Sequence, residues 1–192
     1  GTESACTMTF GYQAVYDSDF LDAINYAAVN RFDYVSFDLN VPRFYVDRLD
    51  RAELRRIRCA AERAGVALAF HLPGDNVSLF ADYPAIRKGI LDHFSAILAA
   101  AEHLGARHVV VHPGIHPSFK QANKKDDDFA REYHEYFSTV LYENLLQLAN
   151  QTRNVLLCVE NYRFTPLTRG VVERLLADTD NLFLTWDIGK TY

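Results

Sequence analysis

The sequence predicts an α/β fold, a (β/α)8 TIM barrel, on three observations. Six short apolar runs alternate with longer segments of helical periodicity. The runs are almost continuously apolar, which is typical of parallel strands covered by helices. Each run ends in a polar residue, and a barrel gathers its strand ends around one mouth, where its functional residues lie. A doubly wound sheet would instead show a glycine-rich turn after the first strand, and residues 11–17 do not form one.

The first three strand–helix units are predicted from periodicity and from helix-end signals. Their strands are expected over residues 8–13, 34–38 and 66–71. Their helices are expected over residues 17–30, 51–63 and 83–104. Ser18 is predicted to cap the first helix, because its hydroxyl can accept a backbone N–H. Gly65 and Gly105 should end the second and third helices, since glycine readily adopts the left-handed conformation found there.

The second half of the chain repeats this pattern. Its strands are expected over residues 108–112, 155–160 and 182–187. A charged loop over residues 114–127 leads into a long helix, and a further helix is expected to begin at Thr168. The long helix is predicted to face inward with side chains at helical spacing, namely Tyr133, Tyr136, Phe137, Val140, Leu141, Leu145 and Leu148.

The chain is short for this fold. Barrels of this type have eight strands and usually ~250 residues, whereas this sequence has 192. We therefore expect one barrel domain over residues 8–192 without its last two strand–helix units, as in a truncated form of a longer protein. Closure of the barrel by another chain is the alternative. Residues 1–7 are small and polar and are expected to be a disordered lead-in or an expression remnant.

Composition narrows the class of protein. A formal net charge of −5 gives no basic footprint for nucleic acid. Cys6, Cys59 and Cys158 are odd in number and far apart, so no disulfide framework is expected and the cytoplasm is the predicted compartment. No apolar run approaches the ~20 residues of a membrane helix, so no membrane partner is expected. A homo-oligomer is left open.

A metal site is predicted at the strand ends. These ends are marked by Gln13, Asp38, His71, His112, Glu160 and Asp187. The last four combine imidazole and carboxylate, a ligand set that suits a divalent ion such as Zn, Mn or Co. We therefore predict that His71, His112, Glu160 and Asp187 bind a divalent metal ion.

Three further polar residues, Gln13, Asp38 and His116, are predicted to contact substrate. Each predicted site residue also has an ordinary alternative when taken singly. A strand-end Asp often caps the next helix, which applies to Asp38 and Asp187. A single strand-end His is often structural, and a loop His such as His116 is often merely exposed. Metal-type residues at four successive strand ends are harder to explain in this way.

Four segments of the sequence resemble a known family. The segments FHLPGDNVSL, ARHVVVHPG, VLLCVENYR and LTWDIGK are similar to the sugar-phosphate isomerase/epimerase and endonuclease IV branches of the xylose isomerase-like superfamily. The resemblance implies that His71 and His112 match two histidines that hold one metal in the endonuclease branch. It implies that Glu160 is a metal ligand in both branches and an acid or base in the epimerases, and that Asp187 is a metal ligand in both.

One position departs from the family pattern. Many relatives carry Asp-x-x-His after the sixth strand, where this chain has Asp187-Ile188-Gly189-Lys190. A protonated lysine is a poor metal ligand but a good donor to a substrate oxyanion or phosphate. Lys190 is therefore predicted, with Glu160, to take part in catalysis. A solvent-facing lysine at the start of the next helix is the alternative for Lys190.

The resemblance implies a metal-dependent sugar or sugar-phosphate isomerase or epimerase that acts through a metal-bound enediolate, with Glu160 moving the proton at carbon. An abasic-site endonuclease acting on DNA is the alternative: the two histidines favour it, whereas Lys190 and the acidic charge oppose it. A non-catalytic barrel that serves as a binding module is the second alternative. Metal analysis separates that module from the two enzymes.

Overall fold

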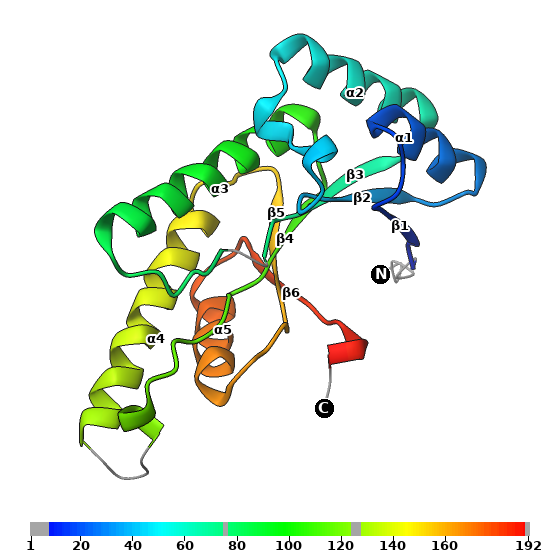
Figure 1. Cartoon of the computed structure of the whole chain (residues 1–192). Helices are drawn as coiled ribbons and strands as arrows, with labels where there is room; N and C mark the ends of the chain where they lie inside the picture. Colours follow the sequence, from blue (N-terminus) through cyan, green and yellow to red (C-terminus); the bar gives the residue numbers. More distant parts are fainter. Residues whose placement is uncertain (1–7, 75–76, 124–127, 191–192) are drawn as a thin grey trace.

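The computed structural model describes residues 8–74, 77–123 and 128–190. Within them, six strands form one parallel sheet in which each strand pairs with the next in the chain (Figure 1). The strands are β1 (Gly11–Ala14), β2 (Tyr34–Asp38), β3 (Ala67–His71), β4 (His108–Val111), β5 (Leu156–Glu160) and β6 (Leu182–Thr185). This order is that of consecutive units in a (β/α)8 barrel, so the predicted fold class is confirmed. The predicted lead-in over residues 1–7 lies outside the described residues.

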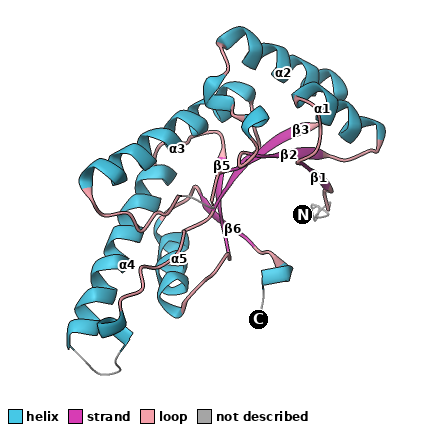
Figure 2. Ribbon diagram, viewed as in Figure 1, coloured by secondary structure: helices cyan, strands magenta, loops and turns pink. Residues whose placement is uncertain are grey.

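Helices cover one face of the sheet (Figure 2). They are α1 (Phe20–Val29), α2 (Arg51–Ala64), α3 (Pro84–Leu104), α4 (Asp128–Ala149) and α5 (Pro166–Asp178). Short 3-10 turns accompany them: η1 (Pro42–Phe44), η2 (Val46–Arg48), η3 (Lys120–Asn123) and η4 (Ile188–Lys190). None of the helices in the described part of the chain has the length and hydropathy to cross a membrane.

Strand β2 shows how the two faces of the sheet differ. Val35 and Phe37 are fully buried, whereas Tyr34, Ser36 and Asp38 are half-buried. Successive side chains of a strand point to opposite faces. The ring of Phe37 lies 4.7 Å from that of Phe20 in α1, so the fully buried side faces the helices. The half-buried side, which carries Asp38 at its end, corresponds to the barrel interior.

The ends of α2 and α3 follow the sequence prediction. Gly65 and Gly105 adopt left-handed φ values of 68° and 69° and end these helices. At its start, α2 has a capping box, in which Asp50 accepts the backbone N–H of Glu53 and the Glu53 carboxylate accepts that of Asp50. These ends fix where β3 and β4 begin, and therefore where their other ends reach the mouth.

Two predicted helix starts were wrong. Asp19 caps α1 in place of Ser18, because its carboxylate accepts the N–H groups of Leu21 and Asp22. Helix α5 begins at Pro166 and not at Thr168, with Thr165 as the cap. Proline has no N–H to lose at the first helical position, so it starts a helix at no cost in hydrogen bonding.

The predicted inward face of α4 was correct except at one residue. Val140, Leu141, Leu145 and Leu148 are buried, and Tyr133 and Phe137 are half-buried. Tyr136 is exposed, and its hydroxyl donates a 3.2 Å hydrogen bond to Asp82. A tyrosine at the edge of an apolar stripe can place its polar end in solvent, which periodicity alone does not reveal.

Candidate metal centre

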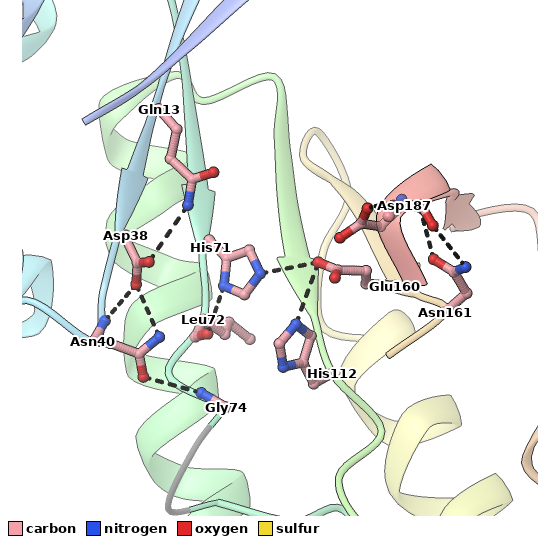
Figure 3. A network of polar contacts seen from close by, with 11 residues as sticks. Gln13, Asp38, Asn40, His71, Leu72, Gly74, His112, Glu160, Asn161 and Asp187 are labelled. Carbon is pink, nitrogen blue, oxygen red and sulfur yellow. Dashed lines mark hydrogen bonds and ion pairs between the residues drawn. The ribbon is translucent and has the colours of Figure 1, made fainter. Parts of the chain in front are cut away.

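Three side chains from neighbouring strands meet at the carboxyl end of the sheet (Figure 3). His71 ends β3, His112 follows β4 and Glu160 ends β5. Their ligand atoms all lie within 4.8 Å of one another. Oε2 of Glu160 lies 3.1 Å from Nε2 of His71 and 3.2 Å from Nε2 of His112.

The register of the sheet explains why these residues meet. His71 is paired with Val110 across β3 and β4, and Val110 with Cys158 across β4 and β5. Since alternate residues of a strand share a face, His112 and Glu160 lie on the same side as Val110 and Cys158, one step nearer the mouth. The three side chains therefore converge because of strand pairing.

The buried carboxylate of Glu160 is held in its ionised form. The interactions with His112 and His71 lower its pKa far below the ordinary value, although burial opposes this shift. For His71, burial is the largest single influence and lowers the pKa. The hydrogen bonds to Glu160 and to the Leu72 carbonyl, with the negative charges of Glu160 and Asp38, together outweigh it, so the pKa of His71 is raised.

His71 has the support that a metal-binding histidine needs. Its Nδ1 lies 3.0 Å from the carbonyl oxygen of Leu72, which can only accept, so Nδ1 carries the proton. This bond fixes the ring orientation and turns Nε2 toward Glu160. Metal-bound histidines typically use their second nitrogen in this way.

His112 lacks such support. Neither of its ring nitrogens has a hydrogen-bond partner among the described residues, and both atoms are buried. Nε2 is close enough to Glu160 for an ion pair but does not have the angle of a hydrogen bond. The ring of Tyr162 stacks on it at 4.4 Å and 17°, and the edge of His71 meets it at 4.7 Å. Packing therefore holds this imidazole in place.

The three residues fit a divalent transition metal. A buried imidazole nitrogen without a partner carries a free-energy penalty, which a bound cation would remove. Two histidines and one glutamate form a ligand set found in zinc enzymes, and one carboxylate oxygen between two imidazoles suits a single shared ion. The described residues can therefore hold such an ion, and the ligand set does not specify which one.

Asp187 lies apart from this cluster. It is two residues beyond β6, and its Oδ1 accepts the N–H of Gly189 at 2.7 Å. Its backbone is held by Asn161, which accepts from the Asp187 N–H at 2.7 Å and donates to its carbonyl at 3.1 Å. The structure thus brings together three of the four predicted ligands, and the ligand role of Asp187 stays a prediction.

Gln13 and Asp38 contact one another. The amide of Gln13 donates to Oδ2 of Asp38 at 3.4 Å, and Oδ1 of Asp38 accepts the backbone and side-chain N–H groups of Asn40. The Asn40 side chain in turn accepts the N–H of Gly74 at 3.3 Å, as Figure 3 shows. Asp38 therefore stabilises the turn after β2, and its contact with substrate stays a prediction.

His116 and Lys190 occupy different surroundings. The His116 ring packs against Phe80 and Phe137, and its Nε2 lies 3.4 Å from Nδ1 of His134. Burial, with the neighbouring His134, lowers its pKa. It thus faces α4. The Lys190 ammonium lies 4.5 Å from the centre of the Tyr162 ring.

Two residues at this site were missed by sequence reasoning. Tyr162 covers His112, and the buried Asn161 joins the ends of β5 and β6. Both follow Glu160 in a short loop, where periodicity gives no signal about side-chain direction. The only available signal was their position beside a predicted ligand.

Comparison with known proteins identifies the family. The family model described as xylose isomerase-like TIM barrel matches residues 24–192. The chain belongs to this family. No curated protein sequence matches it.

Solved structures of both branches are similar in fold. A D-tagatose 3-epimerase-like protein has 19% identity and a TM-score of 0.68, with 95% of this chain and 66% of that chain covered. D-Psicose 3-epimerase from Clostridium cellulolyticum, solved with D-tagatose, has 18% identity and a TM-score of 0.67, with 94% of this chain and 63% of that chain covered. Endonuclease IV from Thermus thermophilus has 21% identity and a TM-score of 0.67, with 95% of this chain and 63% of that chain covered. The chain spans about two thirds of the length of these proteins, and their nearly equal TM-scores do not separate the branches.

Proposed function

We propose that the protein is a metal-dependent isomerase or epimerase of a sugar or sugar phosphate. The observation that carries this proposal is the cluster of His71, His112 and Glu160, with two unpartnered nitrogens on His112 among the described residues. The cluster lies at the strand ends, where barrels of this kind carry their active sites. The similar structures that are named as epimerases support a sugar as the substrate.

The residues of the cluster would act mainly as ligands. When bound, a divalent ion would polarise the carbonyl and hydroxyl oxygens of a sugar as a Lewis acid. Glu160 would remain ionised, because its pKa is lowered far below the ordinary range. In the metal-free protein Glu160 therefore has no proton to lose before it binds a metal ion.

An abasic-site endonuclease is the second candidate. The pair of histidines supports it through the family resemblance, and endonuclease IV is as similar in fold as the epimerases. Lys190 at the position of a family histidine and the net charge of −5 oppose it. A non-catalytic binding module is the third candidate and would have no need to retain the metal.

Metal content and two activity assays test these candidates. Protein loaded with Zn, Mn or Co and then freed of excess ion should retain about one ion per chain, and Glu160→Ala should lose it. The loaded protein should convert D-fructose into its C3 epimer D-psicose, or the phosphate of D-fructose into the phosphate of that epimer, and Glu160→Ala should not. Equal metal content in both proteins would refute the metal site. Cleavage of an abasic duplex without sugar conversion would favour the endonuclease, and retained metal with neither activity would favour the module.

A further inference from the structure

A pair of cations lies beside the candidate metal centre. Tyr162 follows Glu160 by two residues, and its ring stacks on His112. The Lys190 ammonium lies 4.5 Å from the centre of this ring, and the Arg163 guanidinium carbon lies 5.1 Å from it. One aromatic side chain thus contacts both a ligand of the centre and two positive charges.

These two charges are not neutralised within the described residues. Neither the Arg163 nor the Lys190 side chain has an ion-pair or hydrogen-bond partner there. Some other exposed arginines do form ion pairs. Arg169, which borders the same cavity, lies 2.7 Å from Glu173, and Arg58 lies 2.8 Å from Glu62. The carboxylate of Glu173, which lines the same cavity, is engaged by Arg169, so among the described residues it does not pair with Arg163 or Lys190.

A cavity opens next to the pair. It has a volume of about 810 Å³, and Asn161, Tyr162, Arg163 and Lys190 line its polar end. Its apolar end lies between α5 and β6, where Val172, Leu176 and Leu184 line it. The polar end adjoins His112 through Tyr162, so an anionic group that entered there would lie one aromatic ring away from the candidate metal centre.

The backbone at Arg163 is unusual. Its φ is 52°, in the left-handed region that residues other than glycine rarely adopt. This conformation turns the chain between the end of β5 and the start of α5 and keeps Tyr162 and Arg163 together at the rim. Strained backbone of this kind persists where the surroundings require it and often marks a functional site.

We propose that Arg163 and Lys190 bind the phosphate group of a phosphorylated sugar, with Tyr162 setting the spacing between that phosphate and the metal centre. This inference rests on the proposed function and narrows its substrate to a sugar phosphate. A guanidinium and an ammonium complement a phosphate dianion through charge-assisted hydrogen bonds. A neutral sugar hydroxyl would leave both charges uncompensated.

Binding measurements on charge variants test the proposal. Wild-type protein should bind inorganic phosphate saturably in calorimetry. Arg163→Asn, which suits a left-handed backbone, and Lys190→Gln should each weaken that binding by about tenfold. Arg51→Gln on α2 and Lys88→Gln on α3 remove the same charge elsewhere and should bind as wild type. D-Fructose 6-phosphate should bind at least about tenfold tighter than D-fructose, and both rim variants should lose that advantage.

Several outcomes would overturn the proposal. They are absence of phosphate binding, wild-type affinity in both rim variants, or equal affinity for the two sugars. Tighter binding to an abasic duplex than to the sugar phosphate would also overturn it, because the ligand would then be a phosphodiester. Metal content and melting temperature should be unchanged in the rim variants. If the wild type holds no metal while the rim variants still lose phosphate binding, the proposed function fails and the phosphate site stands.

Discussion

The backbone of Gly74 lies directly against the imidazole of His112. A β-carbon added to Gly74 would lie 2.3 Å from Nδ1, well inside any real contact distance. His112 is therefore positioned between this backbone and the ring of Tyr162. Whereas a hydrogen bond to Leu72 orients His71, steric fit orients His112.

Gly74→Ala should accordingly weaken metal binding. The added methyl must displace the ring of His112 and with it the direction of Nε2. Loss of a group that orients a ligand typically lowers metal affinity about 10–100-fold, and we expect a change of that order. Competition with a chromophoric chelator would measure it. Unchanged affinity in Gly74→Ala would show that the ring can move without consequence.

Gly89→Ala provides the matched control and a prediction of its own. Gly89 lies within α3, and a β-carbon there would meet nothing within 4 Å. Alanine is the better helix former, so the free energy of unfolding should rise by about 0.5–1 kcal/mol. Urea titration would show this as a higher midpoint with the same slope. Metal affinity should not change. A fall in stability would contradict the conclusion that a methyl group fits at position 89 without a clash.

The metal-free protein should be most stable in mildly acidic solution. Because its pKa is raised, His71 contributes to the free energy of unfolding. This contribution is fully present below pH 6.5, the ordinary pKa, and is lost as the pH rises through the raised pKa. The lowered pKa of Glu160 gives one that is complete above the ordinary value of 4.5 and is lost as the pH falls through the lowered value. For this pair, stability should therefore be highest between about pH 4.5 and 6.5.

Metal affinity should follow the opposite course. An imidazole must lose its proton to bind a metal, so affinity should rise with pH through the raised pKa of His71. Urea titrations of chelator-treated protein at several pH values would test the stability trend, and chelator competition would test the affinity trend. Glu160→Gln should remove most of the stability trend. Metal-free protein that gains stability between about pH 6 and 8 would contradict the assignment.

Asn161→Ala should destabilise the protein. The buried amide of Asn161 makes two hydrogen bonds with the backbone of Asp187 and so fixes the segment after β6. Unsatisfied buried groups cost about 1–3 kcal/mol, and the free energy of unfolding should fall by that order. Asn150→Ala, at an exposed position, should change it by less than about 0.5 kcal/mol. Similar values for both variants would show that the bridge contributes little.

The sequence predicted well those features that depend on the geometry of the backbone. Apolar runs and glycine helix ends placed the strands, and strand parity placed His112 and Glu160 on one face. The sequence predicted less well which of several nearby groups a side chain contacts. Asp19 competes with Ser18 for the same N–H groups, and the carboxylate of Asp187 turns to Gly189. Tyr162 could not have been predicted, since its contact with His112 depends on the path of a loop.

The candidate centre joins residues that are remote along the chain, since His71 and Glu160 are 89 residues apart. Contacts at this separation form slowly, because the chain entropy of a long loop must be lost before the contact is gained. The three proposed ligands can meet only after β3, β4 and β5 have paired in register. During refolding, metal binding would therefore occur only after the central sheet is complete. The ion would stabilise the native topology late in folding and would not nucleate it.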